Sequence, residues 1–207
     1  MTISFLERRL FAPLRMTDTG FSVPDDKSQR LATVHRHKGG SFGLVATAQD
    51  YWCFAQMMLN GGQLDGVRIL SPHTVAFMTR DHLGDIQMPS SSEGHHSGMG
   101  FGLGFAVMKD PAAAGYISSE GSFGWAGAAA TLFWVDPKED MVVVAMTQHM
   151  GVPAVESLSS QIPALVYSAL LREEAQLRLR MDGDTPGDSR RSRVCRIDGS
   201  NQVETQD

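Results

Sequence analysis

Histidines are the side chains in this sequence whose type and spacing first suggest chemistry. The chain has seven of them, and four form two close pairs, His35 with His37 and His95 with His96. Neither pair has an acidic residue or a cysteine at a familiar ligand spacing, and no His-Glu-x-x-His motif occurs. Histidines in polar loops of this kind are more often solvated than bound to a metal. The sequence therefore predicts neither a metal site nor a cofactor.

A catalytic triad is the second chemistry that the residue types allow. Ser122, Asp136 and His149 form one conceivable Ser/His/Asp set. The sequence gives no geometry for it and contains no Gly-x-Ser-x-Gly elbow. His149 follows an apolar run and could face a cleft from the end of a strand, although a histidine in that place is more often structural. Its role, like that of His95 and His96, stays open.

The composition narrows the class of protein. The 207 residues are 42% hydrophobic with a net charge of -5; this suits a packed domain and disfavours nucleic-acid binding, because phosphate contacts need a basic surface. Cys53 resembles a core residue and Cys195 lies in a polar segment, so no disulfide is expected. No apolar run approaches the roughly 20 residues of a membrane span, and a signal peptide is not apparent. We expect a soluble, cytoplasmic protein without a membrane partner.

Two helices are expected in the first third of the chain. Residues 2–11 place apolar side chains on one side and charged ones on the other. A second helix begins after Thr47, which forms a capping-box-like pattern with Asp50. This helix is apolar on most sides, so we expect it to be buried. Gly61 and Gly62 end it.

Two further helices and a polar tail are expected later in the sequence. Ser71 and Pro72 supply an N-cap and a first helical residue for a short helix that reaches about residue 80. The apolar stripe over residues 155–170 predicts another helix, in which Pro163 either causes a kink or marks the true beginning. Residues 181–207 have almost nothing to bury and predict a disordered polar tail after a domain at 1–180.

Three strands are expected between these helices. Large residues alternate with Gly or Ala over 98–107, which predicts one strand whose Gly face allows another backbone to approach closely. Residues 121–135 predict a second strand, and 141–147 predict a third that returns antiparallel after a tight link. The fold class is therefore α+β, an antiparallel sheet flanked by helices.

Four segments, taken together and in order, resemble the penicillin-recognising serine hydrolases. This family contains the class C β-lactamases, the D-alanyl-D-alanine carboxypeptidases and the β-lactamase-like esterases. The match implies a partial β-lactamase/transpeptidase-like fold and an acyl-enzyme mechanism on a small acyl ester, a β-lactam or a peptide-like substrate. The resemblance is carried by residues 7–21, 43–62, 100–107 and 124–137, and together these span most of 5–170.

The resemblance also assigns roles to one short motif. Trp125-Ala126-Gly127 matches the family's third motif, which lies on a strand at the edge of the substrate cleft and has the Trp form in the esterase-like branch. By position, the backbone N–H of Ala128 would bind the oxyanion, and Gly127 would let the substrate backbone approach. Ala126 departs from the usual glycine and adds one methyl group near the cleft. Without the flanking matches, Trp125 would be interpreted as an ordinary packing residue of a strand.

The other two motifs of the family are missing. No serine has a lysine three residues later, and none of Tyr51, Tyr116 and Tyr167 begins a Tyr-x-Asn motif. In the family both motifs precede the segment that resembles residues 5–21, so the chain is similar to the C-terminal portion of the fold. The link between Leu31 and Gly43 is also shorter than in relatives. We therefore expect no catalytic nucleophile or base in this chain, and no activity of the chain alone.

Three interpretations of this pattern stay open. The first is a β-lactamase-related serine hydrolase present as its C-terminal portion. The second is a non-catalytic binding module or partner subunit derived from that fold, which would associate through an uncovered sheet edge. The third is an internal methionine taken as the start, or a degenerate gene. The residues that select among ester, β-lactam and peptide substrates are expected mostly in the half of the fold that carries the two missing motifs.

Overall fold

A five-stranded antiparallel sheet forms the centre of the computed structural model, which describes residues 2–32, 43–86, 97–149, 152–170, 195–197 and 203–205. The strands follow one another in space as they do in sequence, so each connection is a hairpin or a short excursion at one end of the sheet. They are β3 (Met99–Phe101), β4 (Ala106–Met108), β5 (Phe123–Ala126), β6 (Leu132–Asp136) and β7 (Met141–Ala145).

The prediction of a single strand over 98–107 is wrong, because this segment folds back on itself as a hairpin. Met99 pairs with Met108 and Phe101 with Ala106, and the chain reverses at Leu103-Gly104. Gly104 has φ +93°, a conformation that glycine adopts at little cost. The regular alternation of glycine with large residues is compatible with a single strand, so it conceals the turn chemistry at Gly104.

The strand expected over 121–135 is also two strands, β5 and β6, which pair from Phe123↔Val135 to Ala126↔Leu132. The reversal lies at residues 127–131. Ala130 has φ +58° there, a left-handed conformation that is uncommon for alanine. Because the turn contains three alanines and no Asn or Pro, its sequence gives no ordinary turn signal. The antiparallel return of β7 on β6 is confirmed.

The helices agree closely with the sequence-based expectations. Residues 2–11 are helical, as α1 (Thr2–Leu6) followed by the π-helical turn η1 (Glu7–Phe11). The long helix α2 (Ala48–Leu59) begins at Thr47, whose side chain accepts a hydrogen bond from the Asp50 N–H. Helix α3 (Pro72–Met78) is capped by Ser71 in the same way. Helix α5 (Val152–Ser168) contains Pro163 in its interior, so this proline does not mark the helix start.

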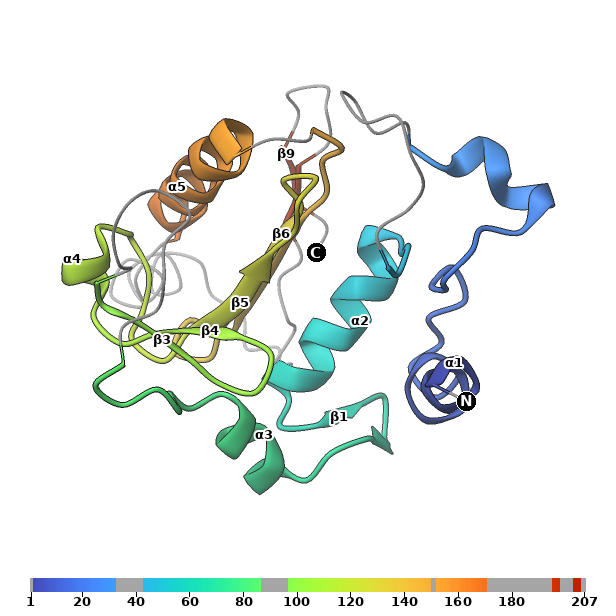
Figure 1. Ribbon diagram of the computed structural model, residues 1–207, viewed down its shortest axis with the longest axis horizontal. Helices are drawn as coiled ribbons and strands as arrows, with labels where there is room; N and C mark the ends of the chain where they lie inside the picture. Colours follow the sequence, from blue (N-terminus) through green and yellow to red (C-terminus); the bar gives the residue numbers. More distant parts are fainter. Residues whose placement is uncertain are drawn as a thin grey trace, which may run out of the picture.

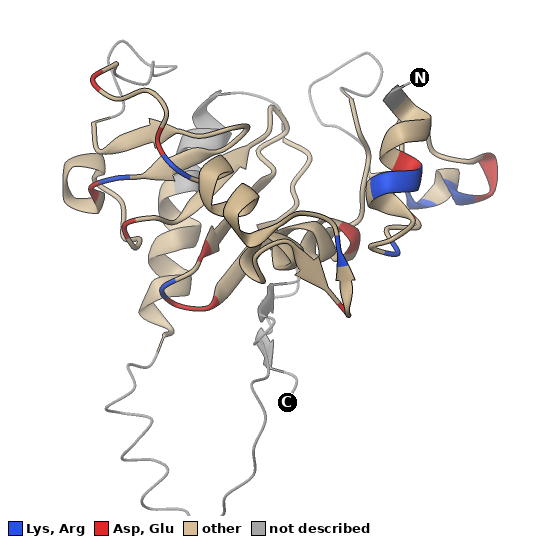
Figure 2. Cartoon of the chain, turned by 90° about the horizontal axis from the view of Figure 1, so that it is seen from below, with Lys and Arg blue, Asp and Glu red and all other residues tan. Residues whose placement is uncertain are grey.

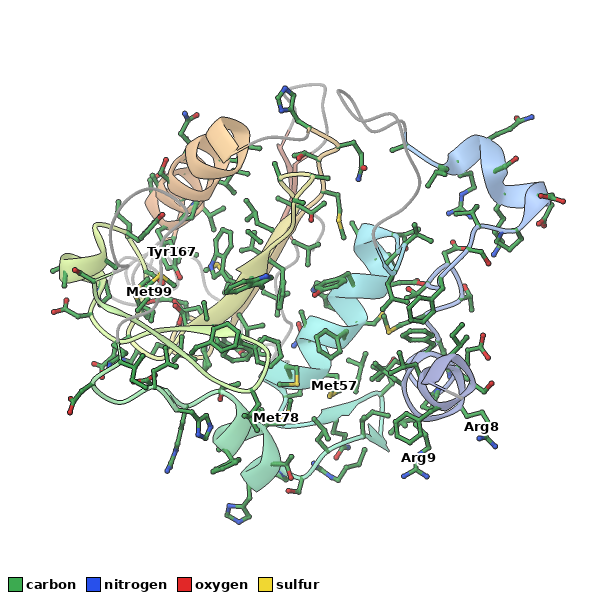
Figure 3. The ribbon with its side chains drawn as sticks, in the orientation of Figure 1. Arg8, Arg9, Met57, Met78, Met99 and Tyr167 are labelled. Atoms are coloured by element: carbon green, nitrogen blue, oxygen red, sulfur yellow. The ribbon has the colours of Figure 1, made fainter. Side chains whose placement is uncertain are left out.

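Two helices cover opposite faces of the sheet, α2 on one and α5 on the other (Figure 1). Tyr51 of α2 meets Phe133 edge-to-face, with ring centroids 4.9 Å apart. On the other face, Tyr167 of α5 stacks on Trp134 at 6.3 Å. Met57 of α2 is fully buried, whereas the exposed Arg8 and Arg9 point away from the molecule (Figure 3). The burial of α2 on most sides is confirmed.

The N-terminal segment is held against α2 by polar contacts. The buried Asp50 carboxylate accepts hydrogen bonds from the Asp18 N–H at 2.7 Å and from the Thr19 hydroxyl at 2.9 Å. Asp18 in turn forms ion pairs with Lys27 and Arg30 of the 3-10 helix η2 (Asp25–Arg30). The residues before α2 are therefore fixed to the start of that helix by charge-assisted hydrogen bonds.

Smaller elements complete the described residues. A two-residue hairpin joins β1 (Gln63–Leu64) to β2 (Val67–Arg68), and the short helix α4 (Pro111–Ala114) follows β4. Within the expected tail, β8 (Cys195–Ile197) and β9 (Val203–Thr205) pair antiparallel. The other residues after 170 lie outside the described part, so the disorder of 181–207 stays a prediction.

Candidate functional site

Within the part of the chain that the structure describes, the edge of β5 beyond Gly124 has no strand beside it on the β4 side. Strand β4 pairs with β5 only at Phe123 and Gly124, because the β3–β4 hairpin turns away at Ala106. On its other side, β5 pairs with β6 along its whole length. Among the described residues, Trp125 and the residues that follow it therefore have a strand partner on one side only.

The register decides which backbone groups face this open edge. The Gly127 N–H donates to the Thr131 carbonyl at 2.7 Å, which directs the backbone groups of Gly127 toward β6. Backbone direction alternates along a strand, so Ala126, the last residue of β5, directs its groups to the opposite side. The same alternation places the Ser122 carbonyl toward β4, where it accepts from the Met108 N–H at 2.8 Å. Ala128 lies in the turn that follows β5. Its N–H shares a peptide plane with the Gly127 carbonyl, which accepts the Ala130 N–H at 3.0 Å, so the Ala128 N–H points away from the inside of the turn. The N–H groups of Ala126 and Ala128 therefore face the open edge.

Trp125 lies on the α2 face of the sheet, at the point where the cover is incomplete. Its side chain is 48% exposed. Phe101 of β3 meets it edge-to-face with ring centroids 5.2 Å apart. Phe123 and Phe133, on the same face, are buried in the core. Trp125 thus has an aromatic neighbour on one side and a solvent-facing surface on the other, an arrangement suited to apolar contact with a ligand.

Phe101 is held in place by an acidic side chain. The Asp81 carboxylate accepts the Phe101 N–H at 3.1 Å and forms an ion pair with Lys109 at 2.8 Å. A hydrogen bond from Lys109 is the main cause that lowers the pKa of Asp81 to about 2. The space where a Cβ of Gly100 would lie is occupied by the Asp81 side chain. The neighbour of Gly100 is thus a side chain. The close approach of another backbone, expected at the Gly face of this segment, is confirmed at Gly102, where a Cβ would overlap the Met78 carbonyl oxygen at the end of α3.

The hypothesis of a Ser/His/Asp triad is wrong, because His149 lies at the opposite end of the sheet from Ser122 and Asp136. Ser122 directly precedes β5 and Asp136 ends β6, and these ends are adjacent through the Phe123↔Val135 pair. The backbone of His149 instead donates to the Ala129 carbonyl at 3.1 Å, beside the β5–β6 turn. The length of β5 and β6 separates His149 from the other two residues, so it cannot accept the Ser122 proton.

Ser122 and Asp136 belong to a buried structural network. Asp136 is fully buried and accepts the Tyr167 hydroxyl at 2.5 Å. It also accepts the backbone N–H groups of Lys138 and Glu139. The Ser118 hydroxyl lies 2.6 Å from that of Ser122. Burial is the main cause that raises the pKa of the Tyr167 hydroxyl, and its hydrogen bond to Asp136 is the second cause. The network joins α5 to the sheet at the end remote from Trp125.

The other candidate groups do not form a reactive centre in the described residues. His35, His37, His95 and His96 all lie outside that part of the chain. Within it, no group of three or more His, Cys, Asp or Glu side chains is placed to hold a metal ion. Cys53 is half-buried in α2, and burial is the main cause that raises the pKa of its thiol, which disfavours the reactive thiolate.

A model of the β-lactamase family matches residues 3–163, which is most of the chain. The chain belongs to the β-lactamase family. Protein Rv1367c of Mycobacterium tuberculosis (strain ATCC 25618 / H37Rv) is 36% identical over 172 residues, which cover 70% of this chain and 42% of the relative. This β-lactamase-related chain thus spans less than half the length of that relative.

Solved structures show the same fold. EstCE1, a hydrolase with promiscuous acyltransferase activity, is 21% identical, with a TM-score of 0.62 over 80% of this chain and 50% of its own. Simvastatin synthase (LovD) from Aspergillus terreus is also 21% identical, with a TM-score of 0.62 over 81% of this chain and 49% of its own. At these identities the likeness concerns the fold, so the α+β class and the β-lactamase-like architecture are confirmed.

Two properties of the surface can be stated for the described residues. No helix there is long and apolar enough to cross a membrane. Among the described residues, basic and acidic positions are scattered over several elements, and both kinds occur together in the N-terminal segment (Figure 2). The open edge at Ala126 and Ala128 is flanked by Trp125 and Phe101 and carries no charge of its own.

Proposed function

We propose that this chain forms the substrate-docking wall of a β-lactamase-related serine hydrolase that works through an acyl-enzyme. The observation that carries the proposal is the open edge of β5, where the N–H groups of Ala126 and Ala128 have no strand partner in the described residues and lie beside the exposed Trp125. An extended acyl substrate would bind there as an added strand. Its class, an ester, a β-lactam or a peptide-like amide, follows from the family.

Each residue of the wall has a separate task in this proposal. The Ala128 N–H stabilises the negative charge that develops on the carbonyl oxygen during acyl transfer. Ala126 directs its backbone groups to the substrate backbone, and Trp125 contacts an apolar part of the substrate. Gly127 lets the substrate backbone approach, and the packing of the turn also requires glycine there, because a Cβ would overlap the Thr131 hydroxyl.

The nucleophile is not part of the wall. No serine of this sequence has a lysine three residues later, so nothing in the chain activates a serine in the manner of the family. We therefore expect the 207-residue chain alone to be inactive. A fluorophosphonate probe should leave it unlabelled, and p-nitrophenyl butyrate and nitrocefin should be turned over no faster than with heat-denatured chain. Labelling of any serine, or turnover that a serine substitution abolishes, would contradict the proposal.

A chimera tests the wall itself. In this chimera, the segment of Rv1367c that matches this chain is removed and replaced by this chain, and the rest of Rv1367c is kept. We expect the fluorophosphonate probe to label the chimera. Ala128→Pro, which removes the proposed oxyanion donor, should slow labelling by about 10²–10³-fold, the usual effect of losing one such donor. Ala128→Gly keeps the N–H and is the matched control.

The outcomes separate the candidate functions. Equal labelling rates for Ala128→Pro and Ala128→Gly would remove Ala128 from the oxyanion site. A folded chimera that stays unlabelled would favour a non-catalytic binding module over a hydrolase component. Circular dichroism and a cooperative thermal melt establish that the chimera has folded.

A further inference from the structure

The turn between β5 and β6 is fixed from outside by the chain that follows β7. The Thr147 hydroxyl donates to the Ala129 carbonyl at 2.7 Å. The backbone N–H of His149 donates to the same oxygen at 3.1 Å. The Ala129 carbonyl thus receives two hydrogen bonds, which uses both of its lone pairs. The turn is therefore held by hydrogen bonds from a segment about eighteen residues later, in addition to the hydrogen bonds within the turn.

Two rigid peptide planes connect this attachment to Ala128. The Ala129 carbonyl shares a plane with the Ala130 N–H, which donates to the Gly127 carbonyl at 3.0 Å. The Gly127 carbonyl, which accepts this hydrogen bond, belongs to the same peptide plane as the Ala128 N–H. Each trans peptide plane holds its C=O and N–H in opposite directions. Fixing the Ala129 carbonyl therefore fixes the direction in which the Ala128 N–H points.

We propose that Thr147 is a positioning residue, which aims the Ala128 N–H at the open edge of β5 through the peptide planes of Ala129–Ala130 and Gly127–Ala128. The relevance to catalysis rests on the proposed function, in which this N–H binds the oxyanion. A donor for an oxyanion is effective when it is already oriented before the charge develops. Consecutive hydrogen bonds also polarise one another, so the Thr147 hydroxyl strengthens Ala128 as a donor.

The backbone of the turn explains why an external attachment is needed. Ala130 has φ +58° and is almost fully buried. A non-glycine residue in this region is strained and persists only where its surroundings hold it. The bonds to the Ala129 carbonyl act directly on the plane that precedes Ala130. Without the Thr147 hydroxyl, we expect the plane to populate more than one orientation.

The test compares Thr147→Val with Thr147→Ser in the full 207-residue chain. Valine keeps the shape and removes the donor, and serine keeps the donor. In Thr147→Val the amide resonances of Ala128 and Ala130 should shift, and the Ala130 amide should exchange about fivefold faster, the loss expected for one ordinary hydrogen bond. Thr147→Ser should restore both signals. Thr79→Val is the matched control, because Thr79 makes the same kind of bond, to the Val75 carbonyl at 3.0 Å, in α3.

The result is independent of enzyme activity. Unchanged Ala128 and Ala130 amides in Thr147→Val would overturn the positioning role, as would equal shifts in the valine and serine variants. A uniform loss of protection over β6 and β7 would show a general structural role instead and would also overturn it. Failure of the chimera to react with fluorophosphonate would remove the catalytic meaning of Ala128 but would leave these amide measurements unaffected.

Discussion

Single residues in this chain acquire their meaning from what lies beside them. Ser122, Asp136 and His149 have the types of a catalytic triad, yet Asp136 is satisfied by Tyr167 and two backbone N–H groups. Trp125 has the type of a core residue, yet its ring is 48% exposed. The type of a side chain limits its possible chemistry, and its partners select among the possibilities.

Tyr167 provides the prediction at this scale. Tyr167→Phe removes the donor that satisfies one oxygen of a fully buried carboxylate. We expect it to lower the free energy of unfolding by about 1.5–3 kcal/mol, the range for hydrogen bonds to charged groups. Urea denaturation at pH 7 measures this change. Tyr167 lies between α5 and the sheet, where the bond joins the two layers (Figure 3).

The dependence of this effect on pH follows from the raised pKa of Tyr167, which burial causes first and Asp136 second. Above about pH 10 the unfolded chain releases the phenol proton while the folded chain retains it. Wild-type stability should therefore fall as the pH rises through this range, and Tyr167→Phe should flatten the fall. Tyr116→Phe is the control. Equal alkaline slopes in wild type and Tyr167→Phe would refute the assignment.

At the scale of elements, hairpins rather than long strands form the site. The β3–β4 hairpin ends its pairing with β5 at Gly124, and this early end leaves Ala126 and Ala128 open. The same hairpin brings Phe101 against Trp125. Two continuous strands in this place would have paired with β5 along its length and closed the edge. The turns therefore create the site.

Gly100 tests how firmly the β3–β4 hairpin is seated. In Gly100→Ala the new Cβ would overlap the Asp81 carboxyl group, which would lose its bonds to Phe101 and Lys109. We expect a loss of about 1–3 kcal/mol in the free energy of unfolding, as for other overpacked positions. Trp fluorescence should also shift, since Phe101 contacts Trp125.

The control for this variant is Gly20→Ala. A Cβ at Gly20 would meet its nearest neighbour, the Ser22 carbonyl oxygen, at 3.4 Å, which is an ordinary contact. This variant should be near wild type in stability and in fluorescence. If both alanine variants have equal stability, Asp81 does not restrict the space at Gly100.

For the whole molecule, ion pairs set the response to acid. Hydrogen bonds from Arg30 first and Lys27 second lower the pKa of Asp18 from 3.8 to about 2. The pKa of Asp81 is lowered to the same value, mainly by Lys109. A carboxylate whose pKa is lowered in the folded state stabilises the folded protein at pH values above its unfolded pKa. This stabilisation is lost as the pH falls through the folded pKa. Stability should therefore be flat above about pH 5 and fall between about pH 4 and 2.

Substitution identifies the carboxylates responsible. Asp18→Asn and Asp81→Asn should each reduce the acid slope, by close to one proton taken up on unfolding between about pH 4 and 2. Urea denaturation at a series of pH values measures this slope. The exposed Asp85→Asn variant serves as the control. A wild-type slope in both Asp18→Asn and Asp81→Asn would contradict the assignment.

The sheet also bears on how whole molecules meet. Strand β7 is the last strand of the sheet in the described residues, with β6 on one side only. By the register, Val142 and Val144 direct their backbone groups away from β6, and an edge of this kind can accept another strand. Association through an uncovered edge, expected from the sequence, stays a prediction, and β7 offers one such edge in the described residues.

Local sequence determined much of this protein. The caps at Thr47 and Ser71 fix the starts of α2 and α3, because each cap needs only a side chain and an N–H three residues later. The apolar stripe over 155–170 placed α5, and the apolar run after a tight link placed β7, for the same reason. The Trp125-Ala126-Gly127 motif and its flanking segments indicated the family. Such features depend on neighbours in sequence, so the sequence alone carries them.

Only the tertiary structure decided the rest. The alternating glycines before Ala106 fit one strand as well as a hairpin, and the alanines after Gly127 give no turn signal. The role of Thr147 had no sequence signal beyond a polar residue after an apolar strand, since its partner carbonyl is eighteen residues earlier. The separation of His149 from Ser122 likewise depends on which strand ends are adjacent. Contacts between distant residues are set by how the sheet folds and pairs, and this decides where the open edge lies.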